Sequence, residues 1–523
     1  MARPISAPPA KSDLPSTPDA SNAASRFNFA VPFLLAAAMA ASERWFTILD
    51  DECAIIDRAA QPLSQTAGLF LRGIGQHEHP PLYDFILHFW LRLTGGEMHL
   101  LRVPAIIFFA LGVWVLASAA RELGGRASQS CVLVLAALWP YGFHFGRVAT
   151  WYSFSFLVVS LLTLGYLRYV EHPSAKNWAW VVGCSLALIY TSYFGWALLA
   201  CLAFDYVIRN YGKGGIRWWP LAGAGAILAA AYIPVYGPFL TEVRNGVHES
   251  SSAGVLLFSW IYHIYCLFVS ESVAPWFWPL GVPAGMAIVV CLLVTFGSIP
   301  PGTRRFLFYF AALLLAMAIL SIGNPKRHML ISAWLVLPVG AALGHAASPA
   351  KRRALMASLV IVGAIGWFGI ISRKLYAAPR WVEPWEEIAQ QAAGVASKDG
   401  IVIGNNPSFF FYLTYFTQPQ ESKHGRFFPG LLPESTRRAN IYDPKQWLDA
   451  DHPVRSTILF VKGLQYSIPA GPTIETEKWL DSYCDAASTR YFAHDIGASW
   501  KQRFSPTTGQ LEWRITEKLY GCQ

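Results

Sequence analysis

The 523-residue sequence contains few charged side chains. Asp, Glu, Lys and Arg together make up 14% of it, whereas soluble globular proteins average roughly 25%. Hydrophobic residues account for 54%. This balance excludes a large soluble enzyme, a disordered chain and a coiled coil. It predicts a protein that lies mostly within a lipid bilayer.

Cysteine is also scarce. Eight cysteines in a chain of this length do not indicate a disulfide framework. Two of them, Cys484 and Cys522, fall in the same C-terminal segment, where a disulfide bond and two unpaired thiols are both open interpretations. The formal net charge of +9 does not indicate a nucleic-acid partner, because much of the basic charge falls in short loops between apolar runs.

Aromatic residues and long apolar runs are abundant. The 21 Trp, 22 Tyr and 33 Phe residues suit the aromatic belts at the surfaces of a bilayer. A membrane-spanning helix needs about 20 mostly apolar residues. We predict about eleven spans, near residues 28–47, 101–119, 129–146, 152–169, 178–192, 195–208, 219–239, 275–297, 306–322, 328–346 and 354–372. The stretch 178–208 is divided in two because Tyr190 to Gly195 indicate a tight reversal.

Basic residues concentrate in alternate connections between these spans. The connections 209–218, 300–305 and 348–353 are short and basic, which is typical of cytoplasmic loops. This pattern predicts a cytoplasmic N-terminus and an extracytoplasmic C-terminus. Residues 1–27, rich in Pro, Ser and Ala, are then a disordered cytoplasmic tail. We expect an integral protein of a plasma membrane, most simply a bacterial inner membrane.

The composition changes at about residue 374. Helix and strand patterns alternate from there on: a helix from Trp385 to Ala396, strands at 400–404 and 456–461, a helix at 474–483 and a late strand at 511–515. Such alternation predicts a small α/β domain over residues 374–523, outside the membrane. The predicted fold class is an all-α polytopic membrane domain over residues 28–373, followed by this small extracytoplasmic α/β domain.

Three consecutive acids follow the first predicted span. Asp50, Asp51 and Glu52 open the first outer loop, which covers residues 48–100. Carboxylates at a membrane boundary are costly unless they are hydrated, paired or functional. On charge alone, a solvated helix end and a functional site are both open.

The same loop holds the sequence HEHPPLY at residues 77–83. Two prolines directly before an apolar run fit the start of a helix. His77 and His79 flank Glu78, and these side chain types bind metal ions. With no clear third partner in the loop, a metal site is the weaker interpretation.

Two basic turns lie on the same predicted side of the membrane. Arg147 follows the third span, and Lys326 and Arg327 precede the tenth. Such cations either hold a phosphate or extend to the lipid headgroups. Because the acids, the imidazoles and both basic turns share one side, they suit a reaction at the outer leaflet on an anionic, lipid-linked substrate.

In these motifs the chain resembles the GT-C-type membrane glycosyltransferases, in the branch of the protein O-mannosyltransferases, the lipid A aminoarabinose transferase and the lipopolysaccharide-core transferases. The resemblance rests on the acidic pair, on HPPLY at 79–83, on LRVP at 101–104 and on WYS at 151–153. It is strongest over residues 49–155. It implies a GT-C-like fold, an outward-facing site and a polyprenyl-phosphate-sugar donor. A hexose or pentose would move to a glycan, lipid or protein acceptor.

The resemblance also implies roles for individual residues. The catalytic acid falls on Asp51, with Glu52 as the alternative and Asp50 as an extra neighbour. The donor phosphate is expected to contact His79, Arg147, Lys326 and Arg327. Substrate binding is expected of His77, Tyr83 and Tyr152. The chain departs from the family pattern at 148–150, where Val-Ala-Thr replaces the frequent Glu-Ala-Arg, so that Arg147 is the only charge in that turn.

The expected chemistry is a single displacement that inverts the anomeric carbon, with a carboxylate accepting the proton of the acceptor. The sequence names no cofactor, and a divalent metal on the acids stays open. The alternative function is that of a polytopic transporter or lipid flippase. That class often shows two related halves and polar groups at bilayer depth. The sequence shows no related halves, and Asp205 is among the few charges near a span, so the transferase is favoured.

Overall fold

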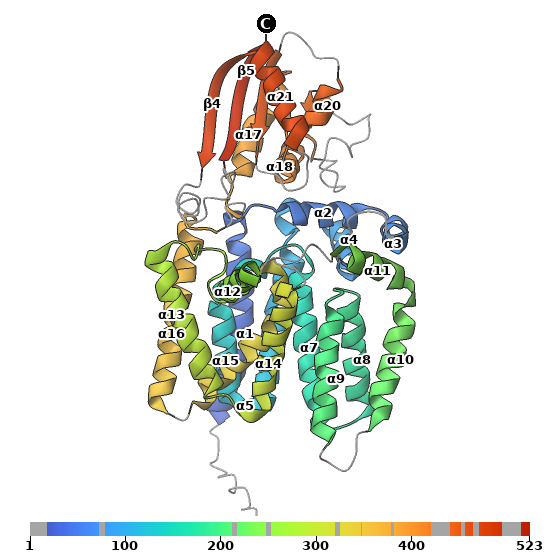
Figure 1. Cartoon of the computed structure of the whole chain (residues 1–523), viewed down its shortest axis with the longest axis vertical. Coiled ribbons are helices and arrows are strands. Elements are labelled where there is room, and N and C mark those ends of the chain that lie inside the picture. The colour runs from blue at the N-terminus through green and yellow to red at the C-terminus, as the bar shows by residue number, and fades with distance from the viewer. Residues whose placement is uncertain are drawn as a thin grey trace, which may run out of the picture.

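The computed structural model describes residues 18–72, 79–211, 217–246, 253–319, 325–346, 348–377, 381–419, 440–450, 456–463, 470–493 and 514–522. Figure 1 shows a bundle of long helices and, above it, a smaller body of strands and helices formed by residues 381–522. We call this smaller part the C-terminal body. The end of the bundle beneath it is the covered end, and the other is the open end. The predicted architecture, a polytopic helical bundle followed by a small part of strands and helices, is confirmed. The number of spans and the side of the membrane on which the C-terminal body lies stay predictions.

Every predicted span contains a helix. The long helices are α1 Pro18–Ala41, α5 Val103–Leu138, α7 Trp151–Glu171, α8 Ala175–Ile189, α9 Gly195–Tyr211, α10 Trp218–Tyr232, α13 Trp278–Phe296, α14 Pro301–Ile319, α15 Met329–His345 and α16 Pro349–Ser372. Seven helical stretches are long and apolar enough to cross a membrane among the described residues. Helices α8 and α9 are separate, as predicted for 178–208. Helix α1 begins ten residues before the predicted span, with a proline in its first turn.

Helix α5 contains two of the predicted spans. Gly124 and Gly125 interrupt its helical backbone, and Gly125 has a φ of 71°, which only glycine adopts without strain. Just after this reversal, Ser128 bonds to His345 at the end of α15, with 3.1 Å between Oγ and Nδ1. Beyond the second limb, Tyr141 donates to the carbonyl of Pro325, in the short 3-10 helix directly before α15. The second limb therefore runs back along α15, and α6 Pro140–Phe145 follows it.

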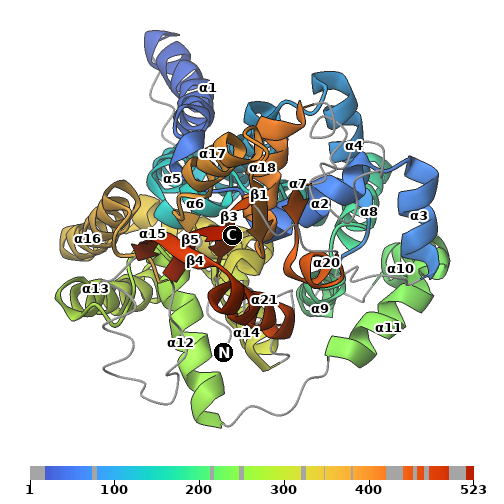
Figure 2. The same ribbon diagram turned by 90° about the horizontal axis from the view of Figure 1, so that it is seen from above.

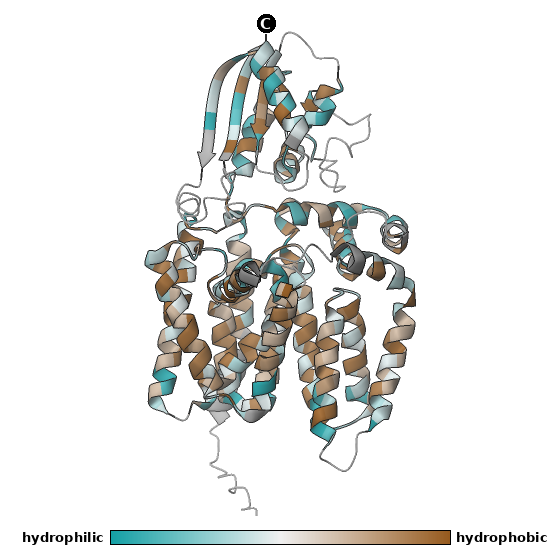
Figure 3. Cartoon of the chain, viewed as in Figure 1, coloured by the Kyte–Doolittle hydropathy of each residue, from teal (hydrophilic) through white to brown (hydrophobic). Residues whose placement is uncertain are grey.

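The outer helices of the bundle expose apolar side chains that the central helix α15 keeps buried. Met286 and Leu293 on α13, and Val360 and Ile371 on α16, are each more than 60% exposed. Figure 3 shows this hydrophobic colouring along the height of the bundle. A soluble monomer rarely exposes apolar patches of this extent. The outer surface is therefore suited to lipid, and the protein is an integral membrane protein.

A buried carboxylate joins three helices near the open end. Asp205 on α9 accepts from Tyr309 of α14 at 3.2 Å and bonds to Tyr166 of α7. It also pairs with Arg209 at 3.1 Å and with Arg305 at 3.2 Å. A charge within a membrane bundle is stable when it is paired in this way. This cluster explains the acid near the sixth predicted span as an interhelical contact.

Short helices gather at the covered end. They are η1 Glu43–Trp45, α2 Asp50–Ala60, α3 Leu63–Arg72, α4 Leu82–Thr94, η2 Met98–Leu100, η3 Ile233–Val235, α11 Tyr236–Gly246, α12 Ala253–Val269 and η4 Pro325–His328. Viewed from above, α2, α3, α11 and α12 lie across the bundle (Figure 2). They form a layer between the long helices and the C-terminal body.

The C-terminal body is a five-stranded mixed sheet with helices. Its elements are α17 Trp385–Ala396, β1 Ile401–Gly404, α18 Pro407–Thr417, β2 Ile441–Tyr442, α20 Pro444–Leu448, β3 Ser456–Lys462, α21 Ala470–Tyr483, β4 Asp485–Ala493 and β5 Arg514–Cys522. The strand order is β2-β1-β3-β5-β4, with β1 parallel to β2 and β3, and β5 antiparallel to β3 and β4.

Four elements of this body were predicted: α17, β1, β3 and α21. The late strand predicted at 511–515 overlaps β5 at Arg514 and Ile515, and β5 continues to Cys522; residues 511–513 lie outside the described residues. Helix α18 was not predicted. Its sequence PSFFFYLTYFT is buried on nearly all sides and has no polar face to reveal a helical period. Asn406 caps it, accepting from the backbone N–H groups of Ser408 and Phe409.

The structure joins Cys484 and Cys522 by a disulfide bond, between the beginning of β4 and the end of β5. We expect the bond to form in cells, because a C-terminal body outside the cytoplasm lies in an oxidising compartment. After denaturation without reductant, a thiol-reactive polyethylene glycol should label the six free cysteines. After reduction it should label all eight. The Cys484→Ser/Cys522→Ser variant should show six labels in both states. Eight labels without reductant would contradict the expectation.

Candidate active site

The acidic run forms the first turn of α2, at the covered end of the bundle. Leu49 precedes the helix in an extended conformation, and Asp50, Asp51 and Glu52 follow it. Negative side chains are favourable there because the N-terminus of a helix carries partial positive charge. Successive residues of a helix point about 100° apart. The three carboxylates consequently face three different parts of the protein.

Glu52 is fully buried and paired with Arg102, which lies directly before α5. The Arg102 Nε and NH2 groups donate to the two carboxylate oxygens at 2.9 and 2.6 Å. The backbone N–H groups of Leu49 and Ala149 donate to the same oxygens at 2.9 and 2.7 Å. Arg102 also donates to the carbonyl of Phe46. Because each oxygen already accepts two hydrogen bonds, Glu52 serves to join the segments around it.

Asp51 occupies a more open position. Its side chain is 43% exposed, and it pairs with Lys326 of η4, whose side chain is 3% exposed. The Tyr152 hydroxyl donates to the same Asp51 oxygen at 3.3 Å. Asp51, Lys326 and Tyr152 were all predicted site residues, and the fold brings them together from α2, η4 and α7. Because its side chain is partly exposed, this carboxylate is accessible to a substrate.

Asp50 turns toward the C-terminal body. Its Oδ1 accepts a hydrogen bond from the Ser408 hydroxyl at 3.0 Å. Asp50 and Asp51 therefore diverge. No group of three or more His, Cys, Asp or Glu side chains suited to a metal ion lies among the described residues. The arrangement of the two acids does not fit a shared divalent metal.

His79 lies against Trp151, with 4.3 Å between ring centroids. Loss of water around the ring and the nearby Arg327 guanidinium lower the pKa of His79 well below its usual range. Its imidazole is neutral at physiological pH and can donate or accept one hydrogen bond. His79 is therefore a polar ring beside Arg327, and its contact with the donor phosphate stays a prediction.

Arg147 faces into the protein. It is 1% exposed, and it donates to the carbonyl of Phe143 at 3.0 Å and to the carbonyl and hydroxyl of Ser42 at 2.9 and 3.0 Å. Its guanidinium also lies 4.2 Å from the centroid of the Phe143 ring and 4.5 Å from that of Phe46. These contacts fix the end of α1 against the turn after α6.

The three residues predicted to bind substrate differ in where the structure places them. Tyr152 lies in the site, as described. Tyr83 is buried at the beginning of α4, and its hydroxyl has no hydrogen-bond partner among the described residues. Burial raises the pKa of the Tyr83 phenol, so that it keeps its proton. His77 lies outside the described residues.

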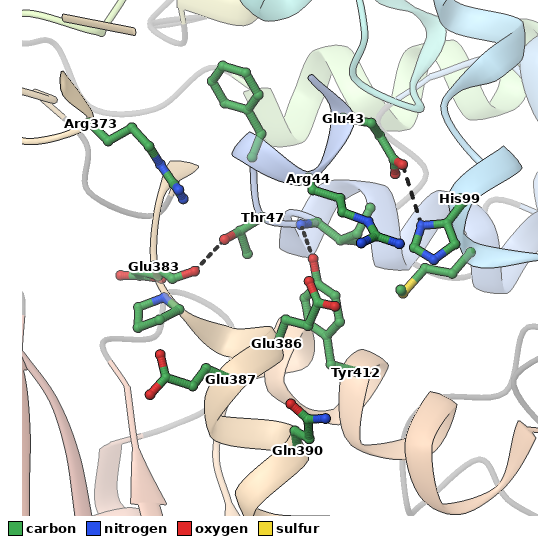
Figure 4. Close-up of a pocket in the computed structure, with 14 residues that line it drawn as sticks. Glu43, Arg44, Thr47, His99, Arg373, Glu383, Glu386, Glu387, Gln390 and Tyr412 are labelled. Carbon is green, nitrogen blue, oxygen red and sulfur yellow. Dashed lines mark hydrogen bonds and ion pairs between the residues drawn. The ribbon is translucent and has the colours of Figure 1, made fainter. Parts of the chain in front are cut away.

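A cleft of about 280 Å³ separates this end of the bundle from the C-terminal body. Glu43, Thr47 and Ile48 line it on the bundle side, and residues 383–390 and Tyr412 line it from the C-terminal body (Figure 4). Sequence reasoning missed the contacts across this cleft, and it took Arg102 only as the beginning of a span. A charged residue directly before a long apolar run was the one available indication that Arg102 has a buried partner.

Breaking the Glu52–Arg102 pair should cost stability. Glu52→Gln leaves the Arg102 charge buried without its counter-charge, which typically costs about 3–5 kcal/mol. We expect a clear drop in the melting temperature of the detergent-purified protein. The control is Arg168→Gln, which removes a partly exposed pair with Glu122 and should cost no more than about 1 kcal/mol. Similar melting temperatures for both variants would contradict a structural role for Glu52.

Comparisons with known proteins agree with this fold. Residues 78–237 match the model of the family described as dolichyl-phosphate-mannose-protein mannosyltransferase. No curated protein matches the sequence closely enough to count as a relative. The structure of ArnT from Cupriavidus metallidurans in the apo state superposes with a TM-score of 0.53 and 14% identity, covering 96% of this chain and 98% of that chain.

Two further structures superpose with lower TM-scores. ArnT bound to undecaprenyl phosphate gives a TM-score of 0.41 and 13% identity, over 96% of this chain and 98% of that one. The oligosaccharyltransferase of Archaeoglobus fulgidus, in a complex with Zn and sulfate, gives 0.40 and 11%, over 88% and 72%. The match to apo ArnT extends over both the bundle and the C-terminal body. Residues 78–237 are therefore similar to this family, and the chain as a whole shares its fold with apo ArnT.

Proposed function

We propose that the chain is a membrane glycosyltransferase that moves a sugar from a polyprenyl-phosphate-sugar donor to an acceptor hydroxyl or amine, with Asp51 as the base. The observation that carries the proposal is the position of Asp51. Its carboxylate is half exposed between two buried groups, Lys326 and Tyr152. Glu52, the alternative base, accepts four hydrogen bonds inside the protein and has no free position for a substrate proton.

The donor class is supported by the family description, which names a dolichyl-phosphate-linked sugar. A polyprenyl phosphate leaving group gains negative charge as its bond to the sugar breaks. Lys326 and Arg327 are cations next to Asp51 and His79, and such fixed charges stabilise a developing anion. Arg147 is not one of the proposed phosphate contacts, because its side chain is 1% exposed and its Nε and one terminal nitrogen already donate to Phe143 and Ser42.

The reaction is a single displacement. The acceptor oxygen or nitrogen attacks the anomeric carbon, and its proton passes to Asp51. The bond from that carbon to the phosphate oxygen breaks, and its electron pair stays on the phosphate. In the resting site Asp51 pairs with Lys326. When the donor phosphate binds, it competes for Lys326, which leaves the Asp51 carboxylate free to accept a proton.

We place the reaction at the outer leaflet. The basic connections 300–305 and 348–353 meet at the open end of the bundle, where the Lys351 Nζ donates to the carbonyl of Gly297 at 3.3 Å. Cytoplasmic ends of membrane proteins collect such charges. Asp51 and the C-terminal body lie at the other end. The disulfide between Cys484 and Cys522 supports the same orientation.

Asp51→Asn should abolish transfer while the protein still folds and binds its donor. The asparagine keeps an oxygen for Lys326 and Tyr152 but cannot take a proton. Loss of a general base typically costs about 10²–10⁴-fold in rate. Donor affinity should be retained or increased, because a negative charge that competes with the phosphate is gone. Purified variants are assayed in lipid, with donor binding measured separately.

The matched control is Asp57→Asn on the same helix, which should transfer normally. In cells, the Asp51→Asn strain should accumulate a polyprenyl-phosphate sugar or lack a sugar on one envelope glycan, compared with the wild-type strain. Near-normal turnover of Asp51→Asn would refute the assignment of the base.

Lys326→Gln and Arg327→Gln should each weaken donor binding tenfold or more, since a charge-assisted hydrogen bond contributes about 1.5–3 kcal/mol. Arg353→Gln, at the open end, is the control and should bind the donor normally. Binding is measured with a polyprenyl-phosphate sugar in detergent. Equal binding by all three variants would favour headgroup contacts for the two predicted cations.

A further inference from the structure

We propose that the C-terminal body positions the catalytic base, and that Ser408 and Tyr412 are its positioning residues. The inference rests on the proposed function, because it assigns to these residues an effect on Asp51. It concerns the segment 46–50, which connects η1 to α2 and directly precedes Asp51. The C-terminal body has no other role in the proposal above.

The segment 46–50 has little regular secondary structure of its own before α2 begins at Asp50. Its backbone groups must therefore find partners elsewhere. The N–H of Thr47 donates to the carbonyl of Trp381 at 3.1 Å. The N–H of Ile48 donates to the Tyr412 hydroxyl at 3.1 Å. The Thr47 hydroxyl bonds to the carbonyl of Glu383. Figure 4 shows the last two contacts at the cleft.

The next contact is to the first acid itself. The Ser408 hydroxyl donates to Asp50 at 3.0 Å. Ser408 lies in the first turn of α18, where Asn406 holds the backbone. Ser408 and Tyr412 are one helical turn apart on α18 and are 3% and 5% exposed. Two side chains on one face of α18 thus bond to residue 48 and to residue 50. These two residues lie on either side of the α2 cap.

Helix α18 is anchored to the bundle. Its side chains Phe409, Phe410 and Leu413 belong to the same continuous apolar core as the long helices. The far side of the sheet has a separate core that includes Ile403, Phe460 and Tyr520. The C-terminal body is therefore packed against the bundle through α17 and α18. Its contacts with the segment 46–50 are part of this packed interface.

Asp51 is thus fixed from two directions. Arg102 and Glu52 hold α2 from the bundle side, and Ser408 and Tyr412 hold it from the C-terminal body. With the second set removed, α2 keeps its ion pair but its first turn gains freedom. Asp51 would then meet the acceptor less often in the reactive geometry, and displacements of about 1 Å at such a site already cost rate. Donor binding through Lys326 and Arg327 would be unaffected.

The test compares Ser408→Ala, Tyr412→Phe and the double variant with the wild type. The controls are Ser397→Ala, whose hydroxyl bonds within the end of α17, and Tyr415→Phe, on α18 itself. Three quantities are measured on purified protein in lipid: kcat, donor KM, and amide hydrogen exchange of the peptide 42–50. Thermal melting shows whether each variant is folded.

We expect each single variant to lower kcat by about 2- to 10-fold, as the loss of one hydrogen bond does, and the double variant to lower it further. Donor KM and both controls should not change. Exchange should rise in the peptide 42–50 and stay unchanged in the long helices.

Two results would overturn the proposal. The first is a wild-type kcat in the double variant when activity has been shown to require Asp51. That result would refute the positioning role and leave the proposed function intact. The other is a loss of activity together with lowered melting and faster exchange throughout the chain, which would make the contacts merely structural. Failure of the proposed function itself is recognised separately, by normal turnover of Asp51→Asn.

Discussion

The buried ion pair between Glu52 and Arg102 is the constraint on which the covered end depends. Both side chains are almost completely removed from solvent. Such a pair is stable only when every oxygen and N–H group has a partner, because two charges have lost their water. The partners here are the backbone groups of residues 43–49 and of Ala149. One pair thereby joins η1 and the segment after it, the beginning of α2, the beginning of α5 and the turn before α7.

Because of this constraint, the three adjacent acids make different contacts. Helical geometry directs Glu52 to the interior, Asp51 toward Lys326 and Asp50 toward Ser408. With Glu52 fully engaged, Asp51 is the carboxylate left with an exposed side chain beside a buried cation. A similar division holds for the basic residues. Arg147 and Arg102 hold backbone carbonyls, whereas Lys326 and Arg327 stand at the site.

The same layer explains how the two parts of the chain act together. The short helices between the bundle and the C-terminal body share the apolar core of the bundle, and polar contacts also join them to one another. Arg58 and His88, for example, join α2 to α4 through Asp84 and the carbonyl of Ala59. A membrane bundle supplies rigid apolar support, and a folded body outside it supplies the polar partners that lipid cannot offer.

The sequence by itself determined the long helices, the reversal near Tyr190, the strands β1 and β3 and the position of the acidic run at a membrane boundary. These features depend on the length of apolar runs, on turn residues and on local periodicity, which neighbouring residues define. The resemblance to the GT-C class singled out Asp51, whose role as the base stays a prediction.

Only the tertiary structure decided which acid is open and which is a structural partner, that Arg147 faces inward, and that α18 reaches the acidic run. Those outcomes depend on residues that are distant in the sequence: Arg102 lies 50 positions from Glu52, Lys326 lies 275 from Asp51, and Ser408 lies 358 from Asp50. A side chain's partner across such separations is set by how the helices pack, and no local pattern in the sequence encodes it.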